Sequence, residues 1–241
     1  MTDLAAPALP ARYRDAQYVA AGAFGQVWRA VLDDGRPVAV KVLDGALVGD
    51  AEVVWRFGAE YRRLLALDHP AFPAAVEDGL LPDGRPFYAM AFAQGRPAAD
   101  DAPLPAARAK QALAGVAQAL GYLHGQGLVH GDLKADNVLV ADDGAVTVLD
   151  VGAASPIGQQ GEGIVGTLEY MAPEVLRRDP AAPEADWYAF ATLGYQLLAG
   201  RTPFVAGPGG AAGLVRAQIF ERPPALPAAA TQEAPPLAAA I

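Results

Sequence analysis

The chain of 241 residues contains no cysteine and only three histidines. Without cysteine it can form no disulfide, and it has no thiolate to offer a metal ion. The histidines, at positions 69, 124 and 130, lack the spacing of zinc ligands. The sequence therefore excludes a disulfide-rich scaffold and a thiolate metal centre.

Basic residues are also scarce, because 18 lysines and arginines face 27 aspartates and glutamates, which gives a net charge of -9. Such a chain is a poor ligand for a nucleic-acid backbone or an anionic membrane surface, so we expect no nucleic-acid partner. No apolar run reaches membrane-spanning length, and the N-terminus lacks the order of a signal peptide. We therefore expect a cytoplasmic domain without a membrane segment, and we leave open an anchor beyond Ile241.

The order of the periodic segments predicts an α+β fold. Residues 1–12 are rich in alanine and proline and are expected to form a disordered leader. Strand-like patterns around two Asp-Gly turns occupy residues 18–30, 36–43, 74–81 and 86–93. Helical spacing of apolar residues marks residues 51–67, 106–124 and 185–199. A strand-rich first third followed by a helical remainder indicates two lobes.

The stretch from His130 to Asn137, followed by Asp150, carries the side chains that phosphoryl transfer needs. Asp132 can accept a proton from a hydroxyl group, and Lys134 can neutralise a phosphate group during its transfer. Asn137 and Asp150 can hold Mg²⁺. This spacing of carboxylates, amide and ammonium predicts a phosphoryl-transfer site.

A second phosphate-binding element is predicted at residues 20–27, where Gly22 and Gly25 flank a tight hairpin. Glycines let backbone N–H groups approach phosphate oxygens closely. An ordinary hairpin with two glycines explains the same residues equally well, so this motif alone does not decide the function.

Lys41 ends an apolar strand, where a lysine usually extends its ammonium group to the surface. It becomes a phosphate ligand only if a carboxylate holds it in place. Glu60 shares a helix face with Leu64 and Leu67 and should point inward, so it is the first candidate for that partner. Glu52 is the second candidate.

In their order along the chain, these motifs make it resemble the catalytic domain of bacterial eukaryotic-like (Hanks-type) Ser/Thr protein kinases, from about Tyr13 to the end. The resemblance extends to segments that carry no chemistry of their own: Leu67-Asp68-His69-Pro70, Gly166-Thr167-Leu168-Glu169-Tyr170-Met171-Ala172-Pro173-Glu174, Asp186-Trp187-Tyr188 and Leu197-Leu198-Ala199-Gly200-Arg201-Thr202-Pro203-Phe204. It implies a bilobal fold. The N-lobe, residues 13–90, would be a small antiparallel sheet with one major helix. A hinge over 91–95 would lead to a mostly helical C-lobe, residues 96–241.

The resemblance also implies roles for individual residues in ATP- and Mg²⁺-dependent transfer to a serine or threonine of a protein substrate. The catalytic set would be Asp132 as base, Lys134 on the γ-phosphate, Lys41 on the α- and β-phosphates, and Glu60 as its partner. The metal ligands would be Asn137 and Asp150. The nucleotide would contact Ala20, Gly22, Gly25, Val27, Ala39, Lys41, Met90, Ala91, Ala93 and Leu139. Thr167 would contact the catalytic aspartate, and Asp186 would brace the catalytic loop from a buried helix.

Gly131 is the main departure from the family pattern, since the family has an arginine here that pairs with a phosphorylated activation loop. Without this arginine, a phosphate on the loop has lost its nearest charge partner. Ser155 is the only hydroxyl residue between Asp150 and Thr167, and the only serine in the chain. We therefore expect activity that does not depend on phosphorylation of this loop.

The remaining departures are smaller. Ala20 replaces the first glycine of the phosphate loop, and Val151 replaces the usual phenylalanine after Asp150. Ala135 stands where proline is common, and we expect little effect from it. In the family Glu174 pairs with a downstream arginine, whereas here residues 236–241 look like the opening of a helix. We therefore expect a truncated chain that lacks the last two helices of the family and is less stable than a longer one.

Two alternatives stay open on the sequence alone. A small-molecule phosphotransferase of the aminoglycoside or choline type often has the sequence His-Gly-Asp that stands here at residues 130–132, but it lacks a segment like 166–174. A pseudokinase that acts as a binding module is the other alternative, because Ala20 and the missing helices weaken the case for catalysis. The oligomeric state and the protein substrate are not predicted.

Overall fold

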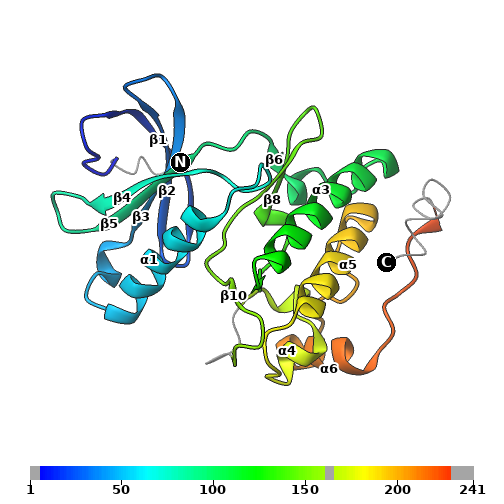
Figure 1. Cartoon of the computed structure of the whole chain (residues 1–241). Helices are drawn as coiled ribbons and strands as arrows, with labels where there is room; N and C mark the ends of the chain where they lie inside the picture. The colour runs from blue at the N-terminus through cyan, green and yellow to red at the C-terminus, as the bar shows by residue number, and fades with distance from the viewer. Residues whose placement is uncertain (1–5, 161–165, 229–241) are drawn as a thin grey trace. The chain divides into compact units, whose positions relative to one another are not determined.

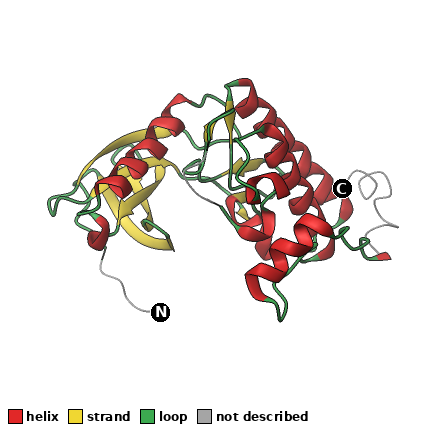
Figure 2. Ribbon diagram, turned by 90° about the horizontal axis from the view of Figure 1, so that it is seen from below, coloured by secondary structure: helices red, strands yellow, loops and turns green. Residues whose placement is uncertain are grey.

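The computed structural model describes residues 6–160 and 166–228. The chain divides into two compact units, Met1–Ala93 and Gln94–Ile241. The division falls within the segment 91–95 that the sequence analysis assigned to a hinge. Figure 2 shows that strands dominate the first unit and helices the second, which is the α+β organisation expected from the sequence.

The first unit is built on a five-stranded antiparallel sheet with the strand order β1-β2-β3-β5-β4 (Figure 1). Its strands are β1 (Tyr13–Gly22), β2 (Gly25–Leu32), β3 (Pro37–Leu43), β4 (Ala75–Leu80) and β5 (Pro86–Ala91). The single predicted strand 18–30 is thus two strands joined by the glycine hairpin. The other three predicted strands are present, and each begins and ends within two residues of its expected position.

The two faces of this sheet have different roles, because successive side chains of a strand point to opposite faces. One face carries the buried core of the unit, which contains Trp28, Val38, Val40 and Phe87. The opposite face carries the residues that alternate with these. Across the strands, Val27 pairs with Lys41 and Ala39 pairs with Met90, and Ala39 and Lys41 lie two residues apart on β3. Four of the residues expected to contact a nucleotide, Val27, Ala39, Lys41 and Met90, therefore share one face.

Helix α1 (Ala51–Ala66) is capped at its N-terminal end by Asp50, whose carboxylate accepts hydrogen bonds from the N–H groups of Glu52 and Val53 at 3.0 and 3.2 Å. Such a cap satisfies donors that the first helical turn leaves free. A short 3₁₀ helix, η1 (Gly45–Leu47), precedes α1. The inward face of α1 contains Phe57, Glu60 and Leu64, all buried.

The prediction of a disordered leader over residues 1–12 is wrong for residues 6–12. Residues 6–12 pack on the first unit: Leu9 lies against its core, and the Pro10 carbonyl accepts a hydrogen bond from the N–H of Tyr13 at 2.9 Å. The side chain of Arg12 forms an ion pair with Glu77 on β4. An apolar leucine and a paired arginine thus tie this part of the leader to the sheet. Residues 1–5 lie outside the described residues.

The second unit is organised around the helices α3 (Ala106–Gly125) and α5 (Pro183–Ala199), which pack against each other. Shorter helices are α2 (Ala98–Asp101), α4 (Pro173–Leu176), α6 (Gly210–Phe220) and the 3₁₀ turns η2 (Ala135–Asn137) and η3 (Leu168–Tyr170). Two small sheets were not predicted: β6 (Arg96–Pro97), β8 (Val138–Val140) and β9 (Val146–Val148) form one, and β7 (Leu128–Val129) with β10 (Ser155–Pro156) the other. Strands of two or three residues are too short to show a period of two.

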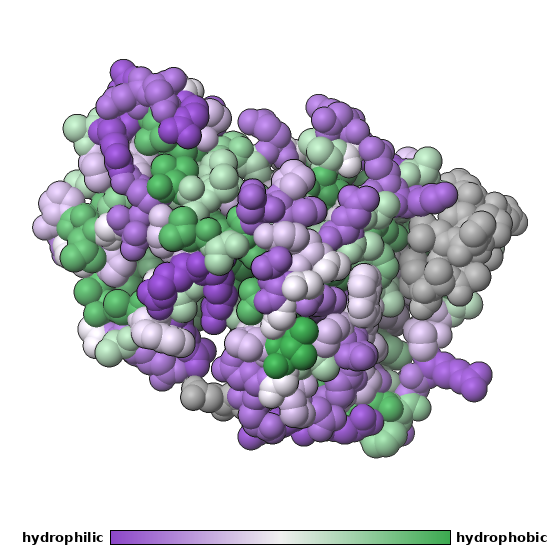
Figure 3. Space-filling model, viewed as in Figure 1, coloured by the Kyte–Doolittle hydropathy of each residue, from purple (hydrophilic) through white to green (hydrophobic). Residues whose placement is uncertain are grey.

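The face of the molecule in Figure 3 carries hydrophobic residues in patches that hydrophilic residues separate. Large apolar side chains that are more than half exposed are Trp55, Leu65, Leu80, Val205 and Phe220. Among residues 6–160 and 166–228, no helix combines the length and the apolar character that crossing a membrane requires.

Candidate functional site

A buried ion pair on the first unit joins Lys41 to Glu60. The ammonium group of Lys41 lies 2.7 and 2.8 Å from the two carboxylate oxygens of Glu60. The hydroxyl group of Tyr88 on β5 donates to the same carboxylate at 2.6 Å. Glu52, the second candidate, is exposed and pairs with Arg56 one turn along α1. The structure therefore joins Lys41 to Glu60 rather than to Glu52.

The geometry of this pair follows from two local patterns. Lys41 and Tyr88 are cross-strand partners of β3 and β5, so their side chains lie on the same face of the sheet. Glu60 reaches them from the inward face of α1. Only 13% of the Lys41 side chain and 6% of the Glu60 side chain are exposed, so water screens this attraction little.

We expect Tyr88→Phe to lower the free energy of unfolding by about 1–3 kcal/mol, because it removes a hydrogen bond to a buried carboxylate and keeps the aromatic ring. Urea unfolding followed by tryptophan fluorescence would measure the change. Tyr18→Phe is the matched control, because Tyr18 lies on the same sheet and is 44% exposed. An equal and small shift in both variants would contradict this role of the Tyr88 hydroxyl group.

The glycine hairpin between β1 and β2 contains two glycines with different environments. A β-carbon on Gly25 would lie 2.0 Å from the carbonyl oxygen of Val42 on β3. This steric clash is by itself sufficient to require glycine at position 25. A β-carbon on Gly22 would meet no atom within 4 Å. Gly22 is exposed, as is Ala20, which pairs with Val27 across the hairpin. Packing therefore explains Gly25, whereas it gives no reason for Gly22.

Three of the predicted adenine contacts, Met90, Ala91 and Ala93, lie at the end of β5 or just after it. Met90 pairs with Ala39 and is half-buried. The N–H of Ala91 donates to the carbonyl of Ala74 at 2.8 Å, so a ligand would have to use the carbonyl oxygen of Ala91. Ala93 is the last residue of the first unit. Leu139 belongs to the second unit, where it is the half-buried middle residue of β8.

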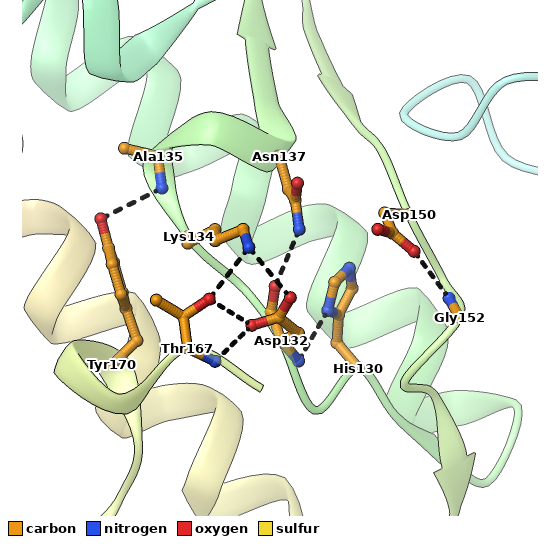
Figure 4. Close-up of polar contacts among 9 residues, drawn as sticks. All are labelled: His130, Asp132, Lys134, Ala135, Asn137, Asp150, Gly152, Thr167 and Tyr170. Atoms are coloured by element: carbon orange, nitrogen blue, oxygen red, sulfur yellow. Dashed lines mark hydrogen bonds and ion pairs between the residues drawn. The ribbon is translucent and has the colours of Figure 1, made fainter. Parts of the chain in front are cut away.

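The segment His130–Asn137, here called the 130–137 loop, holds two polar side chains, Asp132 and Lys134, in direct contact with each other and with Thr167 (Figure 4). One carboxylate oxygen of Asp132 accepts hydrogen bonds from the backbone N–H and the hydroxyl group of Thr167, at 2.8 and 2.9 Å. The ammonium group of Lys134 lies 2.9 Å from the Thr167 hydroxyl oxygen and 3.3 Å from the other Asp132 oxygen. The expected contact between Thr167 and Asp132 is therefore present.

Asn137 and Asp150 are the predicted metal ligands. The side-chain N–H₂ of Asn137 donates to the Asp132 carbonyl at 3.1 Å, and Figure 4 shows the amide oxygen directed away from this bond. Asp150 is exposed, and one of its oxygens accepts from the N–H of Gly152 at 3.1 Å. Within the described residues, no three His, Cys, Asp or Glu side chains group as a metal site. One carboxylate and one amide oxygen suit Mg²⁺, which usually completes its shell with water and phosphate.

Helix α5 holds the beginning of the 130–137 loop through Asp186. This side chain is 1% exposed. Its two oxygens accept the N–H groups of His130 and Gly131, at 2.7 and 3.0 Å, and His124 contacts one of them at 2.8 Å. The bracing role expected for Asp186 is confirmed, while its contact with His124 on α3 was not foreseen.

The far end of the loop is held in a way that the sequence analysis did not predict. The N–H of Ala135 donates to the hydroxyl oxygen of Tyr170 at 3.2 Å, and this hydroxyl group donates to Gln196 on α5. Burial raises the pKa of Tyr170 to about 12, so the phenol is neutral and keeps its donor at any working pH. This hydrogen bond depends on alanine at position 135, where proline is common in the family, because proline has no N–H to donate.

Gly131 has a backbone angle φ of +79°, which side chains rarely adopt. A β-carbon there would lie 2.9 Å from the carbonyl oxygen of Ala153. Glycine at this position therefore has a steric reason as well as the regulatory one that the sequence suggested.

Backbone hydrogen bonds hold the segment after Asp150. Ser155 pairs with Val129 in the small sheet of β10 and β7. The N–H of Gly158 donates to the Ala181 carbonyl at 2.7 Å, and the N–H of Ala181 donates to Gln159 at 3.0 Å. Residues 161–165 lie outside the described residues.

Glu174 is the second residue of α4 and is half-buried. Burial first, and then the negative charge of Glu174, raise the pKa of Tyr188. Within residues 6–160 and 166–228, no arginine forms an ion pair with Glu174. The predicted helix opening at 236–241 lies outside the described residues.

Comparison with known proteins places these features in a family. A family model described as protein kinase domain matches residues 13–222. The serine/threonine-protein kinase PknA of Mycobacterium tuberculosis is 35% identical over 233 residues, which cover 91% of this chain and 53% of the relative. PknL of the same species is 36% identical over 209 residues, covering 81% and 51%. PknJ of Mycobacterium bovis is 35% identical over 234 residues, covering 92% and 40%.

The chain thus spans about half the length, or less, of these relatives. The matched region contains the Lys41–Glu60 pair, the 130–137 loop and the segment around Thr167, whose contacts in the structure have been described above. On the evidence of the family model and of these relatives, the chain belongs to the protein kinase family, and within it to the bacterial Hanks-type serine/threonine kinases.

Proposed function

We propose that this domain transfers the γ-phosphoryl group of ATP to serine or threonine hydroxyl groups of protein substrates. The contact set of Asp132, Lys134 and Thr167 is the single observation that carries the proposal. A carboxylate able to accept a proton lies beside an ammonium group, and Thr167 holds one oxygen of the carboxylate in place. Such a transfer needs little covalent chemistry from a protein, and positioned charges provide most of the catalysis.

In this proposal each side chain has a defined task. Asp132 orients the acceptor hydroxyl group and accepts its proton through the oxygen that faces Lys134. Lys134 stabilises negative charge that develops on the transferred group. Thr167 keeps Asp132 in its rotamer, because two donors from one residue restrict how the carboxylate can turn.

We infer ligands for the nucleotide and for the metal ion from the family to which the chain belongs. Lys41, kept in place by Glu60, would bind the α- and β-phosphates, and Gly22 would let backbone N–H groups approach them. Asn137 and Asp150 would hold Mg²⁺, which neutralises phosphate charge when it is bound. Val27, Ala39, Met90 and Leu139 would contact the adenine ring, and the backbone of Ala91 and Ala93 would hydrogen-bond it.

The segment 166–174 favours a protein acceptor over a small alcohol. It places Thr167 on Asp132, forms the turn η3 and leads into α4, so the contact set depends on it. The relatives named above are serine/threonine-protein kinases, which agrees with this acceptor.

A transfer assay with γ-labelled ATP and Mg²⁺ tests the proposal. Label should pass to a generic protein acceptor such as casein or myelin basic protein, and Asp132→Asn should abolish the transfer. Label passing only to small alcohols would support a small-molecule phosphotransferase instead. Nucleotide binding without any turnover would support a non-catalytic binding module.

We further propose that activity does not require phosphorylation of the segment after Asp150. Ser155→Ala should change kcat by less than about twofold, because this residue is held through its backbone and Gly131 has no guanidinium group to bind a phosphate. The assay would use protein treated with phosphatase, with Thr167→Ala as the variant expected to lose activity. A collapse of kcat in Ser155→Ala would refute the proposal.

A further inference from the structure

The 130–137 loop is attached to helix α5 at two points. Asp186, near the N-terminal end of α5, accepts the N–H groups of His130 and Gly131. Gln196, near the C-terminal end, accepts the hydroxyl group of Tyr170, and Tyr170 in turn accepts the N–H of Ala135. The two points are ten residues apart on the helix, or about 15 Å at a rise of 1.5 Å per residue.

Asp132 and Lys134 lie between these two points of attachment. Ala135 is fully buried, so its N–H requires a partner inside the protein. Tyr170 is also buried, with 6% of its surface exposed. Its hydroxyl oxygen satisfies the Ala135 N–H, and its proton satisfies Gln196. A single phenol group therefore completes the second attachment.

We propose that Tyr170, backed by Gln196, is a positioning residue that sets the place of Lys134 and Asn137 by holding the Ala135 N–H between them. This inference rests on the proposed function. It predicts that loss of the hydroxyl group slows phosphoryl transfer by displacing the loop, while the binding of ATP by the first unit changes little. The device depends on alanine at 135, since a proline there would have no N–H for Tyr170 to accept.

The chain offers a variant that removes the donor without disturbing the backbone. Ala135 is the first residue of the turn η2, a position that proline tolerates well. Lys134 before it is extended, with φ -156° and ψ 166°, as the residue before a proline prefers. Ala135→Pro therefore tests the hydrogen bond rather than the fold.

Kinetic measurements on Tyr170→Phe, Ala135→Pro and the double variant test the inference. We expect Tyr170→Phe to lower kcat about tenfold, with the KM for ATP changed less than about twofold, because one buried donor and one acceptor lose their partner. When Ala135→Pro is already present, adding Tyr170→Phe should lower kcat less than about threefold. Proline at 135 has no N–H, so the loss of the Tyr170 hydroxyl group then leaves no backbone donor unpaired. Equal effects in both backgrounds, or a melting temperature that falls while kcat is unchanged, would overturn the inference.

Amide hydrogen exchange tests the same contact without any assay of transfer. In Tyr170→Phe the Ala135 amide should exchange at least about tenfold faster, whereas the amides of His130 and Gly131, which Asp186 holds, should be unaffected. If Tyr170→Phe does not fold, Gln196→Met should give the same local acceleration. Unchanged exchange at Ala135 in Tyr170→Phe would refute the inference, whether or not the parent domain phosphorylates a protein. Faster exchange in this variant, together with a parent domain that transfers no phosphate, would refute only the proposed function.

Discussion

Asp132→Asn is expected to lower kcat for transfer to a protein hydroxyl group by about 10²–10⁴-fold, the range that a positioned general base contributes. The asparagine amide has nearly the shape of the carboxylate, and its oxygen can still accept the two hydrogen bonds from Thr167. Its N–H₂ group cannot accept a proton, and it would face the ammonium group of Lys134, which lies 3.3 Å from that carboxylate oxygen. The variant should therefore fold, bind ATP and fail in transfer.

Steady-state kinetics with a protein acceptor would measure kcat and the KM for ATP separately. Asp136→Asn is the matched control, because Asp136 lies on the same loop, is exposed, and makes the same change of charge. We expect the control to keep kcat within about threefold of the parent, as surface substitutions usually do. A similar loss in both variants would mean that general loop charge, rather than Asp132, governs the reaction.

Asp186→Ala is expected to lower the free energy of unfolding by about 2–5 kcal/mol. The substitution leaves the N–H groups of His130 and Gly131 and one nitrogen of His124 without their acceptor. Hydrogen bonds to a charged group are each worth about 1.5–3 kcal/mol, and burial makes an unpaired donor expensive. Because the loop that carries Asp132 loses its first attachment, kcat should fall as well.

Thermal unfolding and transfer kinetics on the same samples would measure both effects. Asp186→Asn should be nearly as destabilising as the alanine variant, because its amide N–H₂ would face a backbone N–H where an acceptor is needed. Glu184→Gln is the control, since Glu184 lies on the same helix two residues earlier and is exposed. A melting temperature for Asp186→Asn equal to that of the control would contradict the anchoring role.

Local patterns predicted the first unit well. Alternation around the two Asp-Gly turns placed three of its strands, and helical spacing placed α1 and the inward direction of Glu60. The predictions failed where a segment has no period of its own. Residues 6–12 have no repeating pattern, and they are tied to the sheet by tertiary contacts such as those of Leu9 with the core and of Arg12 with Glu77.

The candidate site divides in the same way. Asp132, Lys134, Asn137, Asp150 and Thr167 are recognisable because their chemistry and spacing follow one another along the chain. The supports of that site, Tyr170 and Gln196, were not predicted. A buried tyrosine and a helix glutamine have many possible partners, and no local pattern says which N–H group each will meet.

The sequence by itself determined the family, the α+β order of elements and the residues able to carry phosphoryl transfer, because these depend on short-range pattern and side-chain chemistry. Only the tertiary structure decided that Glu60 rather than Glu52 holds Lys41, that Gly25 is required by a neighbouring strand, and that α5 holds the 130–137 loop at both ends. The physical reason is burial. A buried polar group must find a partner, and the partner it finds depends on which distant segments the packing of the core brings beside it.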